Sequence, residues 1–283
     1  MSLTQFVPAP KFDDYREQFK EHFNLERRAD GVLLARAHTL GGSIQLSVEN
    51  HRALGQLLKT IGADPENELL ILTGTGKDFM MRIDPDGFAL ERENLQHWAY
   101  EYAFKDGRRN INGLINDLEI PTIGVLNGSG GHAEICLMCD ITICVADAII
   151  FDPHFNMGNV PGDGIHSCFL ELLGVKRGAY ALLTGQRIDA KLALEYGMVN
   201  EVLPRDQLLP RAWALADHIM AQPRPTRRLA AQIVRRPWRR RITDDLDEGF
   251  GIQMFAHLAN NEAVHSQQRA RTAAAAAEAV QKQ

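Results

Sequence analysis

Short apolar runs of strand length alternate with segments of helical spacing over most of this chain, and no other feature constrains its fold more. The runs are rich in Val, Ile and Leu and fall at residues 32–37, 69–73, 122–126, 141–146 and 199–203. Between them lie helical patterns at residues 49–61, 93–118 and 190–196. Asp189 is the expected N-cap of the last of these helices, and Gly197 is its expected end. Strands that alternate with helices predict an α/β fold.

The strand signals end at Pro204, and three helical patterns follow at residues 207–221, 226–236 and 244–261. We therefore expect an α/β core over residues 1–206, in which residues 1–30 are an N-terminal extension, and a helical region over residues 207–283. The alanine-rich tail that begins at Thr272 is expected to be a frayed helix or disordered.

Composition excludes several classes of function. The 283 residues are 45% hydrophobic and 24% charged, and the net charge of -5 argues against general affinity for nucleic acid or an anionic membrane. The N-terminal residues lack the apolar core of a signal peptide, so a cytoplasmic protein is expected. Cys136 and Cys139 have the spacing of a metal or redox motif, but no second pair follows. We expect no metal and no cofactor, and all four cysteines are interpreted as reduced packing residues.

A block of arginines between Arg224 and Arg241 contains no acidic residue, and carboxylates follow it from Asp244 to Glu248. The acidic net charge and these carboxylates favour a solvated helix face or a subunit contact over a nucleic-acid patch.

Two polar stretches near the middle of the chain suggest chemistry. Asp152-Pro-His154-Phe is followed by Val160-Pro-Gly-Asp163-Gly, in a loop between the strand-like residues 149–151 and an apolar, strand-like run after Ser167. An imidazole paired with a carboxylate can take a proton from water near neutral pH. The alternative is ordinary turn chemistry, in which Asp163 only makes an Asx-type turn.

A glycine-rich turn, Asn127-Gly-Ser-Gly-Gly-His132-Ala-Glu134, follows the strand at 122–126 and opens a helix. Free backbone N–H groups at such a helix start can face an oxyanion, and His132 would lie at this mouth. The loop at residues 74–84 also follows a strand, so these two loops and the His154 loop are expected to face one site. Taken alone, His132 could merely cap its helix, and His51 could be a satisfied core or surface histidine.

The chain from about residue 32 to 261 resembles the crotonase, or enoyl-CoA hydratase, superfamily. The matching motifs are Ile71-Leu-Thr-Gly-Thr-Gly, Asn127-Gly, Glu134-Ile-Cys-Leu-Met-Cys-Asp140, Val160-Pro-Gly and Leu182-Leu-Thr-Gly-Gln-Arg-Ile-Asp-Ala. The resemblance implies ββα units wound into a spiral, a helical C-terminal trimerisation region, and assembly as a homotrimer or dimer of trimers.

The sequence departs from the CoA-binding majority at the site. Glu134 matches the first hydratase glutamate, but His154 stands where the second glutamate is found. The usual small-residue loop is replaced by Met80-Met81-Arg82, and His132 replaces the last of three glycines, after Gly131.

These departures resemble the branch of 6-oxocamphor hydrolase and related β-diketone hydrolases, which cleave carbon–carbon bonds without CoA. The resemblance implies that His154, Asp163, His132 and His51 are catalytic. It places Leu46 where that branch has a tryptophan and Gln253 where it has a glutamate, and it keeps Phe88 as an aromatic wall. The expected substrate-binding residues are Leu46, Met81, Phe88, Gly131, Glu134 and Gln253.

The chemistry implied is retro-Claisen hydrolysis of a cyclic or bicyclic 1,3-diketone. His154, oriented by Asp163, would deprotonate water; His132 would stabilise an oxyanion, and His51 would bind a substrate oxygen. Two alternatives stay open: a CoA-thioester hydratase or hydrolase that uses Glu134 and His154, and a non-catalytic binding protein that uses its arginine block on RNA.

Overall fold

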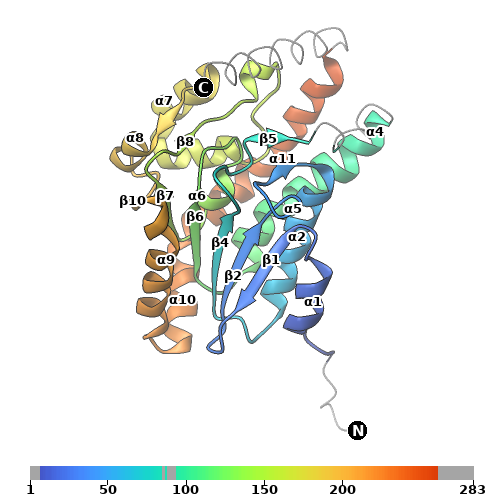
Figure 1. The fold of residues 1–283 in the computed structure, drawn as a ribbon. Coiled ribbons are helices and arrows are strands. Elements are labelled where there is room, and N and C mark those ends of the chain that lie inside the picture. Colours follow the sequence, from blue (N-terminus) through green and yellow to red (C-terminus); the bar gives the residue numbers. More distant parts are fainter. Residues whose placement is uncertain (1–6, 85–86, 88–93, 261–283) are drawn as a thin grey trace.

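A six-stranded sheet forms the centre of the molecule. The computed structural model describes residues 7–84, 87 and 94–260. The strand order is β1-β2-β4-β6-β7-β10 (Figure 1). The strands are β1 (Phe23–Arg27), β2 (Val32–Ala37), β4 (Leu69–Gly74), β6 (Thr122–Leu126), β7 (Ile141–Val145) and β10 (Glu201–Leu203). All five predicted strands are therefore present, and the α/β class is confirmed.

The strands from β2 to β10 are parallel, whereas β1 pairs antiparallel with β2 at the sheet edge. The expected N-terminal extension thus contributes a strand to the core sheet. Because parallel strands end at the same edge, the loops that follow β4 and β6 emerge side by side, where ligands of open α/β sheets are usually bound. Two small sheets lie nearby, β3 (Gln45–Leu46) with β5 (Arg82–Ile83) and β8 (Ile149–Ile150) with β9 (Ile188–Asp189).

Helices cover the sheet on both sides. Figure 1 shows α2 and α5 on one side of the sheet and α9 and α10 on the other. The helices are α1 (Phe12–Gln18), α2 (Val48–Ala63), α4 (Leu95–His97), α5 (Gly107–Asn112), α6 (Glu134–Leu137), α7 (Ile165–Thr184), α8 (Ala190–Glu195), α9 (Arg205–Met220), α10 (Arg224–Val234) and α11 (Arg236–Ala259). A 3-10 turn, η3, spans Phe155–Met157. No helix in the described part of the chain is both long and apolar enough to cross a membrane.

The single helix predicted at residues 93–118 is interrupted in the structure. α4 is followed by the π-helix η1 (Trp98–Asp106), then by α5 and a second π-helix, η2 (Gly113–Asp117). Hydrophobic spacing cannot distinguish an α-helix from its wider π form, because both present one apolar face. Long π segments are rare and are found most often at functional sites.

The strand-like run expected after Ser167 is wrong, since these residues lie inside α7. The apolar segment continues for 20 residues, which is a helical length rather than that of a strand. Gly174, with φ of 72°, kinks this helix. Asp189 does cap α8 as predicted, because its carboxylate accepts a hydrogen bond from Leu192 N.

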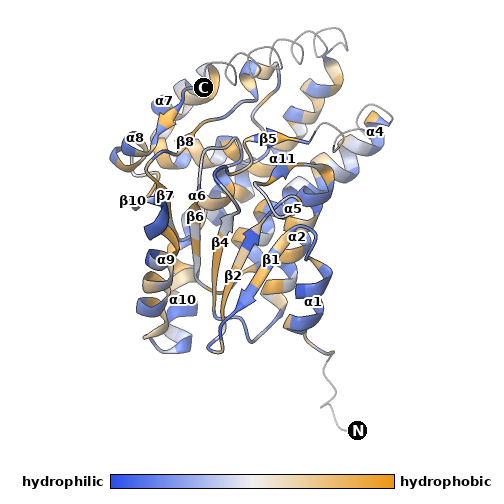
Figure 2. Cartoon of the chain, in the orientation of Figure 1, coloured by the Kyte–Doolittle hydropathy of each residue, from blue (hydrophilic) through white to orange (hydrophobic). Residues whose placement is uncertain are grey.

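Burial follows the strand pattern. Every residue of β4 is buried, and apolar colour concentrates in the central strands of Figure 2. Leu33 and Leu70 are fully enclosed, as is Ile123 in β6. A sheet covered on both faces requires such continuous apolar strands.

The predicted helical C-terminal region is tied to this core by buried ion pairs. Arg235, at the junction of α10 and α11, is fully buried and binds both carboxylate oxygens of Asp140. Its guanidinium also donates to the carbonyl of Ile120 at 3.0 Å and to that of Leu118. A buried charge this well bonded fixes the helices relative to β6 and β7.

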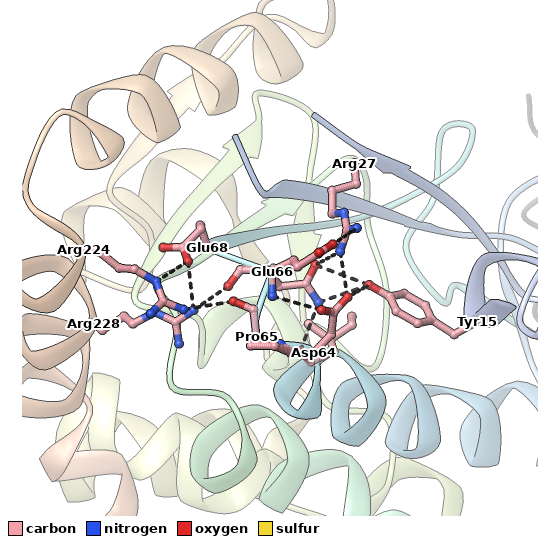
Figure 3. A network of polar contacts seen from close by, with 10 residues as sticks. Tyr15, Arg27, Asp64, Pro65, Glu66, Glu68, Arg224 and Arg228 are labelled. Atoms are coloured by element: carbon pink, nitrogen blue, oxygen red, sulfur yellow. Dashed lines mark hydrogen bonds and ion pairs between the residues drawn. The ribbon is translucent and has the colours of Figure 1, made fainter. Parts of the chain in front are cut away.

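A second network joins α10 to the other end of the core. Figure 3 shows Arg224 and Arg228 reaching Glu68, which also binds Arg227. In the same view Arg27 and Tyr15 reach Asp64. Three arginines of the block therefore form intramolecular ion pairs: Arg227 and Arg228 are largely enclosed, whereas Arg224 is 52% exposed, as a solvated face predicts.

Candidate active site

A small cavity lies beyond the ends of β4 and β6. The space enclosed by its described lining admits roughly one water, about 10 Å³ for the centre of the molecule, and it is partly open to solvent, so a larger ligand would extend outward from it. The described residues that line it are His51, Leu54, Met80, Gly107, Asn110, Ile111, His132, Glu134, Ile135 and Asp163. Four of the predicted site residues, His51, His132, Glu134 and Asp163, are therefore brought together.

His154 lies behind Asp163 and is held between two carboxylates. Its Nδ1 is 2.6 Å from Asp152 Oδ1, and its Nε2 is 3.3 Å from Asp163 Oδ2. Asp163 contacts His154 as expected, and a closer contact, on Nδ1, comes from Asp152. Asp163 lines the described cavity, and His154 contacts Asp163 without being part of the lining.

Local backbone geometry places Asp163. Its Oδ1 accepts a hydrogen bond from Ile165 N at 3.4 Å, so the Asx-type turn exists together with the contact to His154. Gly164 follows with φ of 107°, a conformation that only glycine adopts readily, and begins α7. Gly162 is required for another reason: a Cβ there would lie 2.1 Å from the carbonyl oxygen of Gly249 in α11.

His132 forms the second imidazole–carboxylate pair. Its Nδ1 is 2.8 Å from Glu134 Oε1 and 3.8 Å from Asp163 Oδ2. The His132 ring packs edge-on against the His154 ring, with 6.1 Å between their centroids. Asp163 thus lies between two histidines, each of which has a further carboxylate of its own.

These contacts determine where protons reside. Burial alone would lower the pKa of His132, but the carboxylates of Glu134 and Asp163 outweigh it and raise that pKa to about 9. Burial raises the pKa of Glu134 despite the attraction of His132. The His132–Glu134 pair therefore holds a proton at neutral pH.

In the His154–Asp163 pair, too, neighbouring charges stabilise the charged forms against the effect of burial. Burial opposes the charge on His154, but Asp163 and Asp152 raise the pKa of its imidazole. Burial also opposes the Asp163 charge, yet His154 and His132 keep the pKa of this carboxyl low. Asp163 is consequently ionised, and its charge is balanced by the imidazoles beside it.

His51 faces the cavity from α2. Ser47 and Asn50 cap this helix reciprocally, which fixes the turn from which His51 projects. Its ring centroid lies 6.4 Å from that of His132. Burial, reinforced by His132, lowers the pKa of His51 to about 4, so this imidazole is neutral at physiological pH.

Two N–H groups of the glycine-rich turn are used within the protein. Gly130 N donates to the carbonyl of Ile149, and Gly131 N donates to that of Met80, both at 3.4 Å. α6 begins only at Glu134 and has four residues. Neither of these two N–H groups is therefore free to stabilise a substrate oxygen.

Several predicted substrate-binding residues do not line the described cavity. Leu46 pairs with Ile83 in the small β3–β5 sheet, and Met81 is 40% exposed. Gln253 is buried against Gly162, where its Oε1 has no hydrogen-bond partner. Gly131 contributes the backbone bond to Met80, and Phe88 lies outside the described residues.

Sequence reasoning did not include two polar residues of this site among its candidates. Asp152 is two residues before His154, and this spacing brings its Oδ1 to both the backbone N and the Nδ1 of His154. The Asp-Pro-His motif contained that signal. Asn110 belongs to no motif, and only the packing of α5 brings it to the cavity.

Comparison with known proteins places the chain in a family. The model of the enoyl-CoA hydratase/isomerase family matches residues 45–273. The chain belongs to this family, the crotonase superfamily. Among curated members, a probable enoyl-CoA hydratase of Mycobacterium leprae is 26% identical over 222 residues, which cover 77% of this chain and 84% of that protein. The fatty acid oxidation complex subunit alpha of Shewanella frigidimarina is 28% identical over 69% of this chain, but the match covers only 28% of that longer protein.

A solved crotonase-fold structure is similar over nearly the whole chain. It is a β-diketone hydrolase from the cyanobacterium Anabaena sp. PCC 7120, bound to (S)-3-oxocyclohexyl acetic acid. The two structures have a TM-score of 0.82 and 30% identity, and the match covers 90% of this chain and all of the other. The crotonase fold expected from the sequence is therefore confirmed.

Proposed function

We propose that this crotonase-superfamily protein hydrolyses a carbon–carbon bond of a cyclic or bicyclic 1,3-diketone without CoA. The observation that carries the proposal is the chain Asp152–His154–Asp163 beside the His132–Glu134 pair. It supplies both a base and an acid at one cavity. The similarity to a β-diketone hydrolase supports the same assignment.

The first step is the addition of water. A water beside Asp163 gives its proton to the His154–Asp163 pair, while Asp152 holds the other nitrogen of His154. The oxygen attacks one carbonyl carbon, and a tetrahedral oxyanion forms. His132, protonated because of its raised pKa, donates from the nitrogen that Glu134 does not occupy.

The second step breaks the bond between the attacked carbon and the central carbon. The electron pair of that bond passes into the second carbonyl and gives an enolate, and the attacked carbon becomes a carboxylic acid. The proton taken from water returns to the central carbon. One water is consumed, and a cyclic diketone gives a single keto acid.

The rate acceleration that this hydrolysis needs requires several catalytic groups. General base catalysis contributes about 10² to 10⁴-fold, and one well-placed oxyanion donor contributes roughly 10² to 10³-fold. His154 alone is therefore insufficient, and the neighbouring pairs must act with it.

Turnover in heavy-oxygen water tests the proposal. A panel of cyclic and bicyclic 1,3-diketones is incubated with the protein, and we expect the heavy oxygen to appear in the carboxylate of the keto acid. His154→Ala should lose at least 10²-fold in kcat. The control variant is His218→Ala, which changes a histidine on α9, outside the cavity. If the wild-type protein converts none of the diketones, the proposal fails.

A CoA-thioester hydratase is the second candidate. Its support is the curated enoyl-CoA hydratase relative and the presence of two carboxylates, Glu134 and Asp163, in the cavity wall. Each carboxylate is engaged by imidazole, which disfavours the two-glutamate hydration of the majority. Hydration of an enoyl-CoA panel, with no diketone turnover, would favour this candidate.

We also propose that the protein works in the cytoplasm as a homotrimer or a dimer of trimers. Large apolar side chains project from α10 and α11, and two of them, Ile233 and Phe255, are 73% and 74% exposed in the single chain. Several large apolar side chains on one helix are thus exposed, which is typical of a surface that another subunit covers.

A further inference from the structure

Two polar side chains of the described cavity wall, His51 and Asn110, have no part in either imidazole–carboxylate pair. Asn110, on α5, is 2% exposed. Neither its Nδ2 nor its Oδ1 has a hydrogen-bond partner in the structure. Buried amides are nearly always bonded, so a free one in a cavity wall marks a place where a ligand completes the bonding.

Packing on both sides holds Asn110 in place. A methyl group at Gly55 of α2 would come within 2.9 Å of Asn110 Oδ1, so the glycine leaves the space that the carboxamide occupies. Gly107 and Ile111, on the same helix, line the cavity with it. The side chain is therefore fixed between α2 and the cavity rather than free to turn away.

The other polar side chains of the described cavity do not supply a hydrogen-bond donor for a second substrate oxygen. Asp163 and Glu134 are acceptors, and the N–H groups of Gly130 and Gly131 are already used within the protein. His132 can donate to one oxygen, and the single N–H of the neutral His51 is engaged by the backbone of Tyr102. A 1,3-diketone presents two carbonyl oxygens, and both must be bonded when the central bond breaks.

We infer that Asn110 donates an Nδ2 hydrogen to the second carbonyl, the oxygen that becomes the enolate, and so selects 1,3-diketones over monoketones. The inference rests on the proposed function. Charge builds on this oxygen as the carbon–carbon bond breaks, so the hydrogen bond strengthens in the transition state. A site built to bond an oxygen rejects an analogue that lacks it, because its amide is then left unpaired.

The test measures binding without turnover. His154→Ala serves as the parent, and its affinities for 2,2-dimethylcyclohexane-1,3-dione and 2,2-dimethylcyclohexanone are compared by calorimetry. The methyl groups prevent the dione from ionising at its central carbon. We expect the parent to prefer the dione by about tenfold, the value of one net hydrogen bond. Adding Asn110→Leu, in which the new side chain has a branched shape similar to that of Asn, should abolish the preference, so that the two ketones bind with about equal affinity.

Two further variants isolate the donor. Asn110→Ala removes the donor without adding a group that could donate in its place, so it should lose the preference as well. Asn112→Leu, on the same helix but outside the cavity lining, should keep it. The unfolding temperature of Asn110→Leu should be unchanged or higher, because an unpaired buried amide is replaced by an apolar group.

The outcomes separate the two proposals. If Asn110→Leu keeps the dione preference, or weakens both ketones equally, Asn110 only packs and the inference fails. If the wild-type protein does not hydrolyse the dione in heavy-oxygen water, the proposed function fails, whatever the binding ratio. If neither ketone binds to the parent, both fail.

Discussion

His154 and His132 hold protons that the proposed reaction uses in opposite ways. His154 must lose its proton to act as a base, and the pKa of its imidazole is raised above the ordinary 6.5 by Asp163 and Asp152 against the effect of burial. His132 must keep its proton, and its pKa is about 9. We therefore expect kcat/KM for a diketone to rise with pH through a pKa above 6.5 and to fall through one near 9.

Two variants assign the limbs of this pH–rate profile. Asp152→Asn removes one carboxylate that raises the pKa of His154, so the acidic limb should move to lower pH while kcat falls, since the Asn amide favours the wrong tautomer. His132→Gln should abolish the alkaline limb. An unshifted acidic limb in Asp152→Asn would contradict the role given to that carboxylate.

At this scale the sequence predicts residues that belong to motifs and misses those that depend on packing. His51, His132, Glu134 and Asp163 meet at the cavity as expected, because each lies at or near the end of a recognisable strand or helix. Asn110 could not be predicted, since its position depends on how α5 packs against Gly55.

At the scale of elements, Arg235 joins the C-terminal helices to the sheet. Replacing it with Leu would leave Asp140 buried without its charged partner, and breaking a buried pair in this way costs about 3–5 kcal/mol. We expect a corresponding loss in the free energy of unfolding, measured by urea titration. Arg236→Ala, at an exposed neighbouring position, should stay within about 0.5 kcal/mol of the wild type. Equal losses in the two variants would show that the Arg235–Asp140 pair does not anchor the helices.

The elements themselves were predictable where the period of the apolar residues is unambiguous. β2 and β6 have the predicted bounds, whereas the run after Ser167 was assigned the wrong type because a short apolar window fits either a strand or a buried helix. The π segments η1 and η2 leave no such signal. These two π segments nevertheless flank α5, the helix that carries Asn110 to the cavity.

For the whole molecule, the fold and the chemistry have separate determinants. The parallel sheet brings the loops after β4 and β6 to one edge, and the bridge from Gly130 to Ile150 places β8 and the His154 loop beside them. The proposed change of reaction needs only His154 and His132 on those loops, with Asp152 and Glu134 behind them. Fold similarity therefore indicates where the site is, and the side chains decide what it does.

Assembly is the property of the whole molecule that the exposed C-terminal helices predict. Phe255, on α11, is 74% exposed in the single chain, and a charge at this position in a subunit contact would be buried without a partner. We expect Phe255→Asp to reduce the mass measured by light scattering from that of a trimer or hexamer to that of the 31.6 kDa chain. Leu40→Asp, at a 95% exposed position in the loop after β2, should leave the mass unchanged. A monomeric wild-type protein, or a Phe255→Asp variant that assembles normally, would contradict a subunit contact on this face of α11.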